Sequence, residues 1–279
     1  MTNIQPPSSL STFRLRRRTP GSFLLVPCSR LGRSIRCQGQ LEAAAAVTLA
    51  ACPQVRDIQE QPAVVWYRWS ETAGNFQIEL LDSQPAKRSR PREGAGCSYI
   101  VPDFLVAMTD DRKRLVEVKA SPRLARPLAQ RKLAVARLFA ARIGATFYLV
   151  TEKELFSGPL VSNLRLLGRY ANAGTEESLS EQLAAIVPVA GISLVELALR
   201  ADTDPSSPLV RMHVFHLLAV GRLSFDPRLR PMDNQTILFP QGAISWDPFD
   251  SVWAPSGSWT GGPSVWSASS QPIGSSPKT

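Results

Sequence analysis

Residues 100–119 of the chain read IVPDFLVAMTDDRKRLVEVK. Two apolar runs on either side of the charged TDDRK segment predict a pair of short strands joined by a tight turn. Side chains alternate along a strand, so Glu117 and Lys119 share one face while the valines beside them point the other way. Asp103 opens the first strand, directly after a proline. The stretch therefore places three charged residues where a strand pair would be expected to carry apolar ones.

These three charges point to an active site. A charged side chain beside a buried face costs free energy unless it is paired or binds a metal ion. Two carboxylates offer the oxygen ligands that hard divalent cations prefer, and an ammonium beside them can contact a phosphodiester. The residues therefore predict nuclease chemistry. The alternative stays open, because exposed strands also carry charges and the pattern of Asp followed by Glu-x-Lys arises by chance.

A helix predicted for residues 39–51 carries a further carboxylate, Glu42. It is the first acidic residue of the chain, and no basic residue follows it three or four positions on. Glu42 is therefore a candidate third ligand for a metal ion. The alternative is an ordinary surface position on an alanine-rich helix.

Composition limits the class of protein. The chain has 279 residues, a net charge of +9 and a pI of about 9.9, which favours a nucleic-acid partner although anionic membranes attract the same charge. No apolar run is long enough to span a bilayer. The Ser- and Arg-rich N-terminus is compatible with an organellar transit peptide, but a disordered basic arm has the same composition and is preferred. The four cysteines form no CxxC pair and indicate reduced thiols of a cytoplasmic protein rather than a zinc site.

Four segments follow from the pattern along the chain. They are a basic N-terminal arm (1–38), an α/β domain (39–171), a small helical domain (172–240) and a disordered tail rich in Trp, Ser, Gly and Pro (241–279). In the α/β domain we expect strands at 55–59, 63–69, 76–81, 99–108, 114–119 and 146–150, and helices at 39–51, 127–143, 152–156 and 160–170. The continuously apolar run 146–150 predicts a central strand. The fold class expected is a mixed sheet flanked by helices.

In the small domain, helices at 179–187, 192–201 and 209–219 precede strands at 223–226 and 235–239. Three helices and a hairpin predict a winged-helix-like fold. His213 and His216 lie three residues apart, but a second pair of ligands is missing, so we interpret them as core or surface residues rather than a metal site. The tail tryptophans are compatible with a docking peptide or with an inert tail.

The motifs together resemble a known family. Pro102-Asp103 followed by Glu117-Val-Lys119, with a helical Glu42 upstream, is similar to the PD-(D/E)xK nuclease superfamily, which has a restriction-endonuclease-like fold. The wider series resembles the TnsA family, the endonuclease subunits of heteromeric transposases, and consists of Leu41-Glu42, residues 55–62 (VRDIQEQP), 101–104 (VPDF), 116–119 (VEVK), 147–152 (FYLVTE) and 163–167 (NLRLL). The resemblance spans residues 37–171. The chain departs from the family in its basic arm, which has no clear counterpart, and in its Trp-rich tail, which is unusual.

The resemblance implies a mechanism and a set of ligands. Asp103, Glu117, the carbonyl of Val118 and Glu42 would bind Mg²⁺, for which Mn²⁺ could substitute. Lys119 would orient the attacking water and stabilise charge on the scissile phosphate. The product would be a nick with a 5′-phosphate and a 3′-hydroxyl at the 5′ ends of a mobile element. Glu60 is expected to be structural.

The partners expected are double-stranded DNA at the transposon ends, a DDE-type transposase that joins the 3′ ends, and an AAA+ ATPase that regulates both. DNA contacts are predicted for the basic loop and the arm, at Lys87, Arg88, Arg90, Arg92, Arg16, Arg17 and Arg18, unless these are simply solvated. Two rivals remain: a stand-alone restriction or repair nuclease of the same fold, and a non-catalytic DNA-binding assembly factor.

Overall fold

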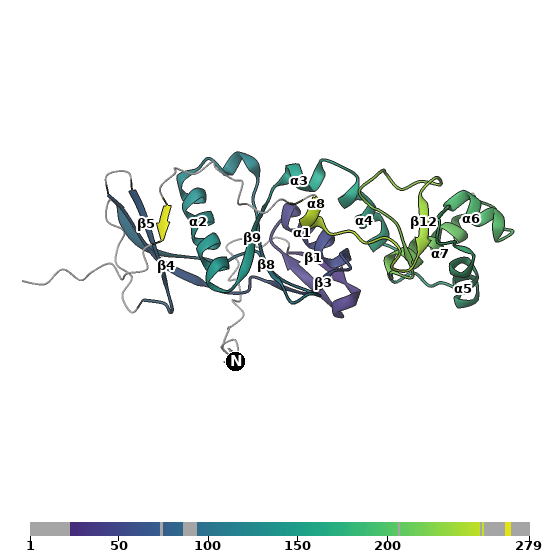
Figure 1. Cartoon of the computed structure of the whole chain (residues 1–279), viewed down its shortest axis with the longest axis horizontal. Helices are drawn as coiled ribbons and strands as arrows, with labels where there is room; N and C mark the ends of the chain where they lie inside the picture. Colours follow the sequence, from purple (N-terminus) through teal and green to yellow (C-terminus); the bar gives the residue numbers. More distant parts are fainter. Residues whose placement is uncertain are drawn as a thin grey trace, which may run out of the picture. The chain divides into compact units, whose positions relative to one another are not determined.

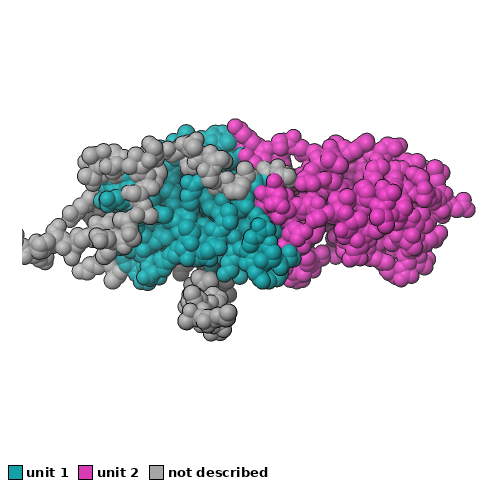
Figure 2. All heavy atoms as spheres, viewed as in Figure 1, with its two compact units in different colours: residues 1–21, 56–151, 253–279 teal, residues 22–55, 152–252 magenta. Residues whose placement is uncertain are grey.

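The computed structural model describes residues 23–72, 75–85, 94–205, 207–251, 253 and 266–268. Within these residues the chain is a mixed α/β protein with several small sheets and eight α-helices (Figure 1). It forms two compact units, shown in Figure 2. Among the described residues, unit 1 comprises 56–151, 253 and 266–268, and unit 2 comprises 23–55 and 152–251. The mixed α/β class predicted from the sequence is confirmed.

Unit 1 contains the predicted strand pair, in a four-stranded sheet of order β3-β7-β8-β9. Its strands are β3 (Val55–Glu60), β7 (Phe104–Met108), β8 (Lys113–Val118) and β9 (Ala145–Val150). β7 and β8 form an antiparallel hairpin, in which Phe104 lies opposite Val116. The connecting turn places Asp111 at a φ of 65°, a left-handed conformation that aspartate adopts more readily than most residues.

Helix α2 (Pro127–Arg142) connects β8 to β9, which run parallel. Pro127 suits the first turn of a helix, where its missing N–H would have no partner, and Gly144 follows the helix with a φ of 66°. Leu133 and Ala136 of α2 pack in one core cluster with Leu115 of β8. This helix therefore covers the face of the sheet that also carries Glu117.

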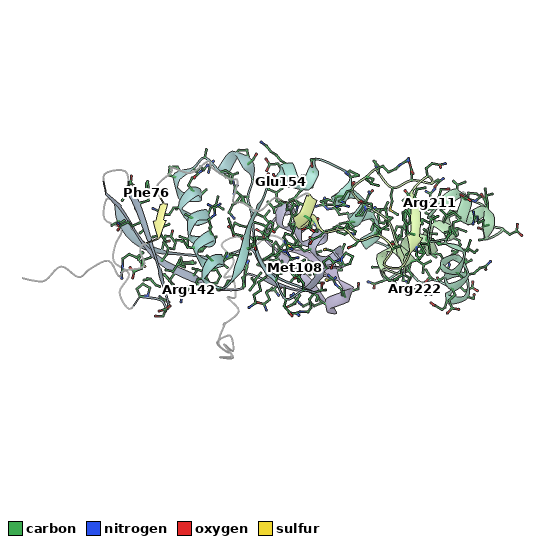
Figure 3. All side chains as sticks on the ribbon, in the orientation of Figure 1. Phe76, Met108, Arg142, Glu154, Arg211 and Arg222 are labelled. Atoms are coloured by element: carbon green, nitrogen blue, oxygen red, sulfur yellow. The ribbon has the colours of Figure 1, made fainter. Side chains whose placement is uncertain are left out.

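A second sheet of unit 1 has the order β13-β5-β4-β6. Its strands are β4 (Val65–Thr72), β5 (Asn75–Leu81), β6 (Ala95–Ile100) and β13 (Trp266–Ala268). Tyr67 of β4 is fully buried and belongs to the same core cluster as α2. Arg131 of α2 lies over the ring of Trp69, with its guanidinium carbon 3.9 Å from the ring centroid. At the C-terminal end of α2, Arg142, which is labelled in Figure 3, pairs with Asp82.

Unit 2 begins with a hairpin where the sequence predicted part of a loose arm. β1 (Leu24–Cys28) and β2 (Arg33–Cys37) pair antiparallel around the short 3-10 helix η1 (Ser29–Leu31). Val26, Cys28, Ile35 and Cys37 alternate with exposed residues, so they lie on one face of the hairpin, and this face is buried. The abundance of arginine in the segment conceals this pattern. The prediction of an arm is therefore wrong for residues 24–37. Residues 1–22 lie outside the described part of the chain.

Helix α1 (Gln40–Ala51) follows the hairpin, as predicted. Its alanines favour a helix, and Arg30 donates hydrogen bonds to the carbonyls of Leu49, Ala50 and Cys52 at its C-terminal end. A guanidinium there satisfies carbonyl groups that the helix leaves open and complements the helix dipole.

The remainder of unit 2 is largely helical. Its helices are α3 (Glu152–Phe156), α4 (Leu160–Gly168), α5 (Glu177–Ile186), α6 (Leu194–Arg200), α7 (Pro208–Ala219) and α8 (Pro248–Ser251). The strands β10 (Ile192–Ser193), β11 (Leu223–Ser224) and β12 (Ile237–Pro240) form a sheet of order β10-β12-β11. The three predicted helices and the hairpin are present, and β10 is an addition. No helix among the described residues combines the length and the apolar character needed to cross a membrane.

Three details differ from the sequence prediction. The single strand predicted at 99–108 is two strands, because Pro102 lacks the N–H that would continue the ladder. β9 lies at the end of its sheet order and is not central; its apolar run reflects burial on both faces, since Phe147, Tyr148 and Val150 are all buried. Residues 241–251, predicted as disordered tail, include helix α8, and Trp246 is buried.

Candidate active site

The β7–β8 hairpin brings together three of the four predicted catalytic residues. Asp103 lies between β6 and β7, and its carbonyl accepts a hydrogen bond of 2.9 Å from the backbone N–H of Gln61. The last pair of the hairpin joins Phe104 to Val116, so Asp103 is one residue beyond it and opposite Glu117. Directly opposite residues of an antiparallel pair project to the same side.

Hydrogen bonds lock the cluster of Asp103, Glu117 and Lys119, which we call the hairpin cluster. Asp103 Oδ2 accepts a bond of 2.7 Å from the backbone N–H of Val118. Lys119 Nζ lies 2.7 Å from Glu117 Oε1 and 3.5 Å from Asp103 Oδ2. The ammonium also donates to the carbonyl of Val118 at 3.1 Å. One ammonium group therefore bridges the two carboxylates.

The hairpin cluster is buried and opens to solvent through its lysine. The side chains of Glu117 and Asp103 are 9% and 13% exposed, whereas that of Lys119 is 27% exposed. Burial raises the pKa of Asp103, against the opposing effect of Lys119. Burial, and then the neighbouring Asp103 carboxylate, raises the pKa of Glu117 to about 7. A second positive charge beside the two carboxylates would stabilise their ionised forms and offset the effect of burial.

One buried oxygen fits the binding of a cation. Glu117 Oε2 has no hydrogen-bond partner among the described residues, although it is shielded from solvent. A buried acceptor without a donor is costly, and a divalent ion would supply the missing positive contact. In the part of the chain that the structure describes, no three Asp, Glu, His or Cys side chains converge on one point. The two carboxylates would therefore need the carbonyl of Val118, water or a more distant carboxylate to complete a coordination shell.

Glu42 belongs to unit 2, in the first turn of α1. Its Oε2 accepts a hydrogen bond of 2.7 Å from the backbone N–H of Gln38, in the manner of a capping carboxylate. This contact explains the conformation of its side chain without a metal ion. Its role as a third ligand of the hairpin cluster stays a prediction.

The other residues singled out from the sequence divide into three groups. The predicted DNA contacts, Arg16, Arg17, Arg18, Lys87, Arg88, Arg90 and Arg92, lie outside the described residues. Glu60 ends β3, next to the Gln61 whose N–H holds Asp103. His213 is buried with its Nδ1 at 3.0 Å from Ser180 Oγ, and His216 Nδ1 is 3.0 Å from the carbonyl of Tyr170. His213 is therefore a core residue, and His216 is partly buried.

Arg114 is a buried charge that the sequence analysis overlooked. It is 4% exposed on β8, on the face opposite Glu117, and donates to the hydroxyl of Tyr148 at 2.6 Å. Its guanidinium carbon lies 5.5 Å from the centroid of the same ring. The signal was present in the sequence, because Arg114 precedes Val116 and Val118 at steps of two residues and so shares their buried face.

The raised pKa of Glu117 predicts how stability depends on pH. A carboxyl whose pKa is higher in the folded state than in the unfolded state makes the protein most stable below the unfolded pKa, and this stability is lost as pH rises towards the folded pKa. For the shift of Glu117 from 4.5 to about 7, the metal-free protein should lose on the order of 3 kcal/mol of unfolding free energy as pH rises from about 5 to about 8.

Chemical denaturation of the wild type and of Glu117→Gln across this range measures the effect. Glutamine keeps the shape of the side chain and removes the titrating group. The unfolding free energy of the variant should therefore fall less with rising pH than that of the wild type, by most of the predicted loss. A decline of equal size in both proteins would show that Glu117 is not held in a costly ionised form.

Comparison with known proteins supports the assignment of the domain that carries the hairpin cluster. Residues 52–152 match the family model described as TnsA-like endonuclease N terminal. The match includes Asp103, Glu117 and Lys119 and does not extend to Glu42. A search of curated proteins found no match. Within this chain, residues 52–152 are therefore a TnsA-like endonuclease N-terminal domain.

Proposed function

We propose that the chain is a Mg²⁺-dependent DNA endonuclease of a transposition system. The observation that carries this proposal is the buried pair of carboxylates bridged by Lys119, with Glu117 Oε2 left without a partner. The family match supports a nuclease of transposition as the function of residues 52–152. Mn²⁺ is expected to substitute for Mg²⁺, because both accept the same oxygen ligands.

The residues of the hairpin cluster would divide the chemistry between them. Asp103 and Glu117 would hold the cation, with the carbonyl of Val118 as a further oxygen ligand. When bound, the cation supplies Lewis-acid stabilisation of the charge that develops on the phosphate. Lys119 would direct its ammonium towards the scissile phosphate and the attacking water. The backbone N–H of Val118 keeps Asp103 in place throughout, since it does not depend on the cation.

The domain organisation that we propose follows the sequence boundaries. Residues 39–171 form the endonuclease domain, and residues 172–240 form a winged-helix-like domain. Support for the latter comes from α5, α6 and α7, which share one core cluster with Leu223 of β11 and Leu238 of β12. The substrate would be double-stranded DNA at the ends of a mobile element, nicked at the 5′ ends. A DDE-type transposase and an AAA+ ATPase are the expected partners.

Supercoiled plasmid carrying candidate element ends provides the test. We expect divalent-metal-dependent nicking by the protein alone or together with the transposase encoded beside it. Nicking that needs the transposase supports the transposition role, whereas nicking of any plasmid without it favours a stand-alone nuclease. DNA binding with no nicking under either condition, and with no effect of Asp103→Asn on any activity, would favour the non-catalytic assembly factor.

Glu42→Gln tests the third carboxylate. Glutamine keeps an acceptor for the N–H of Gln38 and removes the charge, so the helix cap is preserved. If Glu42 helps to hold the cation or its water, the Mg²⁺ concentration for half-maximal nicking should rise about 10- to 100-fold. Glu196→Gln, an exposed carboxylate paired with Arg200, is the matched control and should leave the requirement unchanged. Equal Mg²⁺ requirements in both variants would restrict Glu42 to capping α1.

A further inference from the structure

The segment that follows Lys119 is an ordered, basic turn. The 3-10 helix η2 (Ser121–Arg123) lies in it, and the N–H of Arg126 donates to the carbonyl of Arg123 at 3.2 Å. The buried amide of Gln130 donates to the carbonyl of Leu124 at 2.6 Å and so ties the turn to α2. Residues 120–126, which we call the arginine turn, are therefore held in place before any ligand arrives.

The charge around the arginine turn is unbalanced. From residue 120 to residue 151 the sequence contains no Asp or Glu and contains six basic residues, Arg123, Arg126, Arg131, Lys132, Arg137 and Arg142. Two of these have partners within unit 1, since Arg131 stacks on Trp69 and Arg142 pairs with Asp82. Arg123 and Arg126 are exposed, and among the described residues no carboxylate pairs with either.

The arginine turn lies close to the hairpin cluster. Arg123 is four residues beyond Lys119, so their Cα atoms are at most about 14 Å apart even in a fully extended chain. The hydrogen bonds of the turn shorten this distance further. Phosphates succeed one another every 3.4 Å or so along the axis of a DNA strand, so an arginine here can reach a phosphate a few nucleotides from one that contacts Lys119.

We propose that Arg123 and Arg126 bind the DNA backbone beside the scissile phosphate and position it over the hairpin cluster. The inference rests on the proposed function. It adds Arg123 and Arg126 to the DNA contacts predicted from the sequence for the basic loop and the N-terminal arm. Guanidinium groups bind phosphate oxygens in a bidentate geometry, and a turn fixed by Gln130 loses little conformational entropy on binding. The contact is made to the backbone, so it contributes affinity and register without sequence preference.

The direct test is the salt dependence of DNA binding, measured in a Lys119→Met background so that the duplex is not cut. The test variant is Arg123→Gln/Arg126→Gln. The control is Arg112→Gln/Lys113→Gln, which removes the same charge at the start of β8, about 17 Å along the strand from its last residue, Val118. For two lost phosphate contacts, the slope of log affinity against log salt should decrease by about 1.8 in the test variant and stay unchanged in the control.

Arg123→Lys/Arg126→Lys serves as the rescue variant, because it keeps the charge and should restore most of the slope. An equal slope and affinity for the test and control variants would overturn the inference. The same substitutions in a cleaving background should raise KM about 10-fold and change kcat less than about 3-fold, as expected when uniform binding is lost.

The two proposals fail in different ways. If the wild type nicks DNA and the arginine substitutions change neither slope nor KM, the nuclease function stands and the arginine turn is not its backbone contact. If the slope falls as expected but no condition gives metal-dependent nicking, the surface binds DNA and the nuclease proposal fails. A slope that falls equally for the duplex and for an acidic polypeptide competitor would assign the turn to an acidic protein surface and overturn the inference.

Discussion

Asp103→Asn is expected to lower the rate of DNA nicking about 1000-fold, the scale on which enzymes lose activity when a group that stabilises charge in the transition state is removed. Asparagine keeps an oxygen that can accept from the N–H of Val118, so the hairpin should fold as before. It removes one of two anionic ligands and leaves Glu117 paired with Lys119 at 2.7 Å. The cation would then have to compete with a lysine for the one remaining carboxylate.

Initial rates of plasmid nicking at saturating Mn²⁺ give the measurement. Asp110→Asn is the control, since Asp110 is an exposed aspartate in the turn of the same hairpin and pairs with Arg112. We expect the control to retain nearly full activity. If Asp103→Asn nicks within a few-fold of the control, Asp103 cannot be part of the reaction centre.

Lys119→Met is expected to lower nicking by roughly 100- to 1000-fold, because the ammonium no longer stabilises charge on the phosphate. Its effect on metal binding should be the opposite of that of Asp103→Asn. In the structure the ammonium occupies Glu117 Oε1 and approaches Asp103 Oδ2, so its removal frees both carboxylates for the cation. Metal affinity should therefore be retained or increased while the chemistry is lost.

Lys113→Met is the matched control for this variant, because Lys113 is an exposed lysine at the start of β8, the strand that Lys119 directly follows. Parallel titrations of metal affinity and nicking rate in the two variants separate the roles of binding and chemistry. A loss of metal affinity in Lys119→Met equal to the loss of nicking would mean that the lysine supports the structure of the site rather than the reaction.

The hairpin cluster could be predicted because its geometry is local. Alternation within one strand places Glu117 and Lys119 on the same face, and a tight turn brings Asp103 back to them. The resulting contacts join residues no more than sixteen positions apart. The resemblance to a nuclease family added roles to residues whose proximity the pattern had already indicated.

Features that depend on distant segments or on competing signals could not be predicted in this way. The β1–β2 hairpin was hidden because its exposed arginines gave the segment the composition of a loose arm. The edge position of β9 depends on which strands pair, and an apolar run is the same whether burial comes from strands or from helices. The partner of Glu42 was also beyond reach, because the hydrogen bond from Gln38 is a capping contact that a catalytic pattern does not suggest.

Binding of Mn²⁺ to the metal-free protein, measured by calorimetric titration near pH 8, tests the central claim most directly because it requires neither DNA nor a partner. We predict binding by the wild type, binding at least as tight by Lys119→Met, and affinity reduced about 100-fold in Asp103→Asn and in Glu117→Gln. Wild-type affinity in both carboxylate variants would contradict the claim, because the cation would then bind elsewhere and the hairpin cluster would be a buried ion pair without a metal.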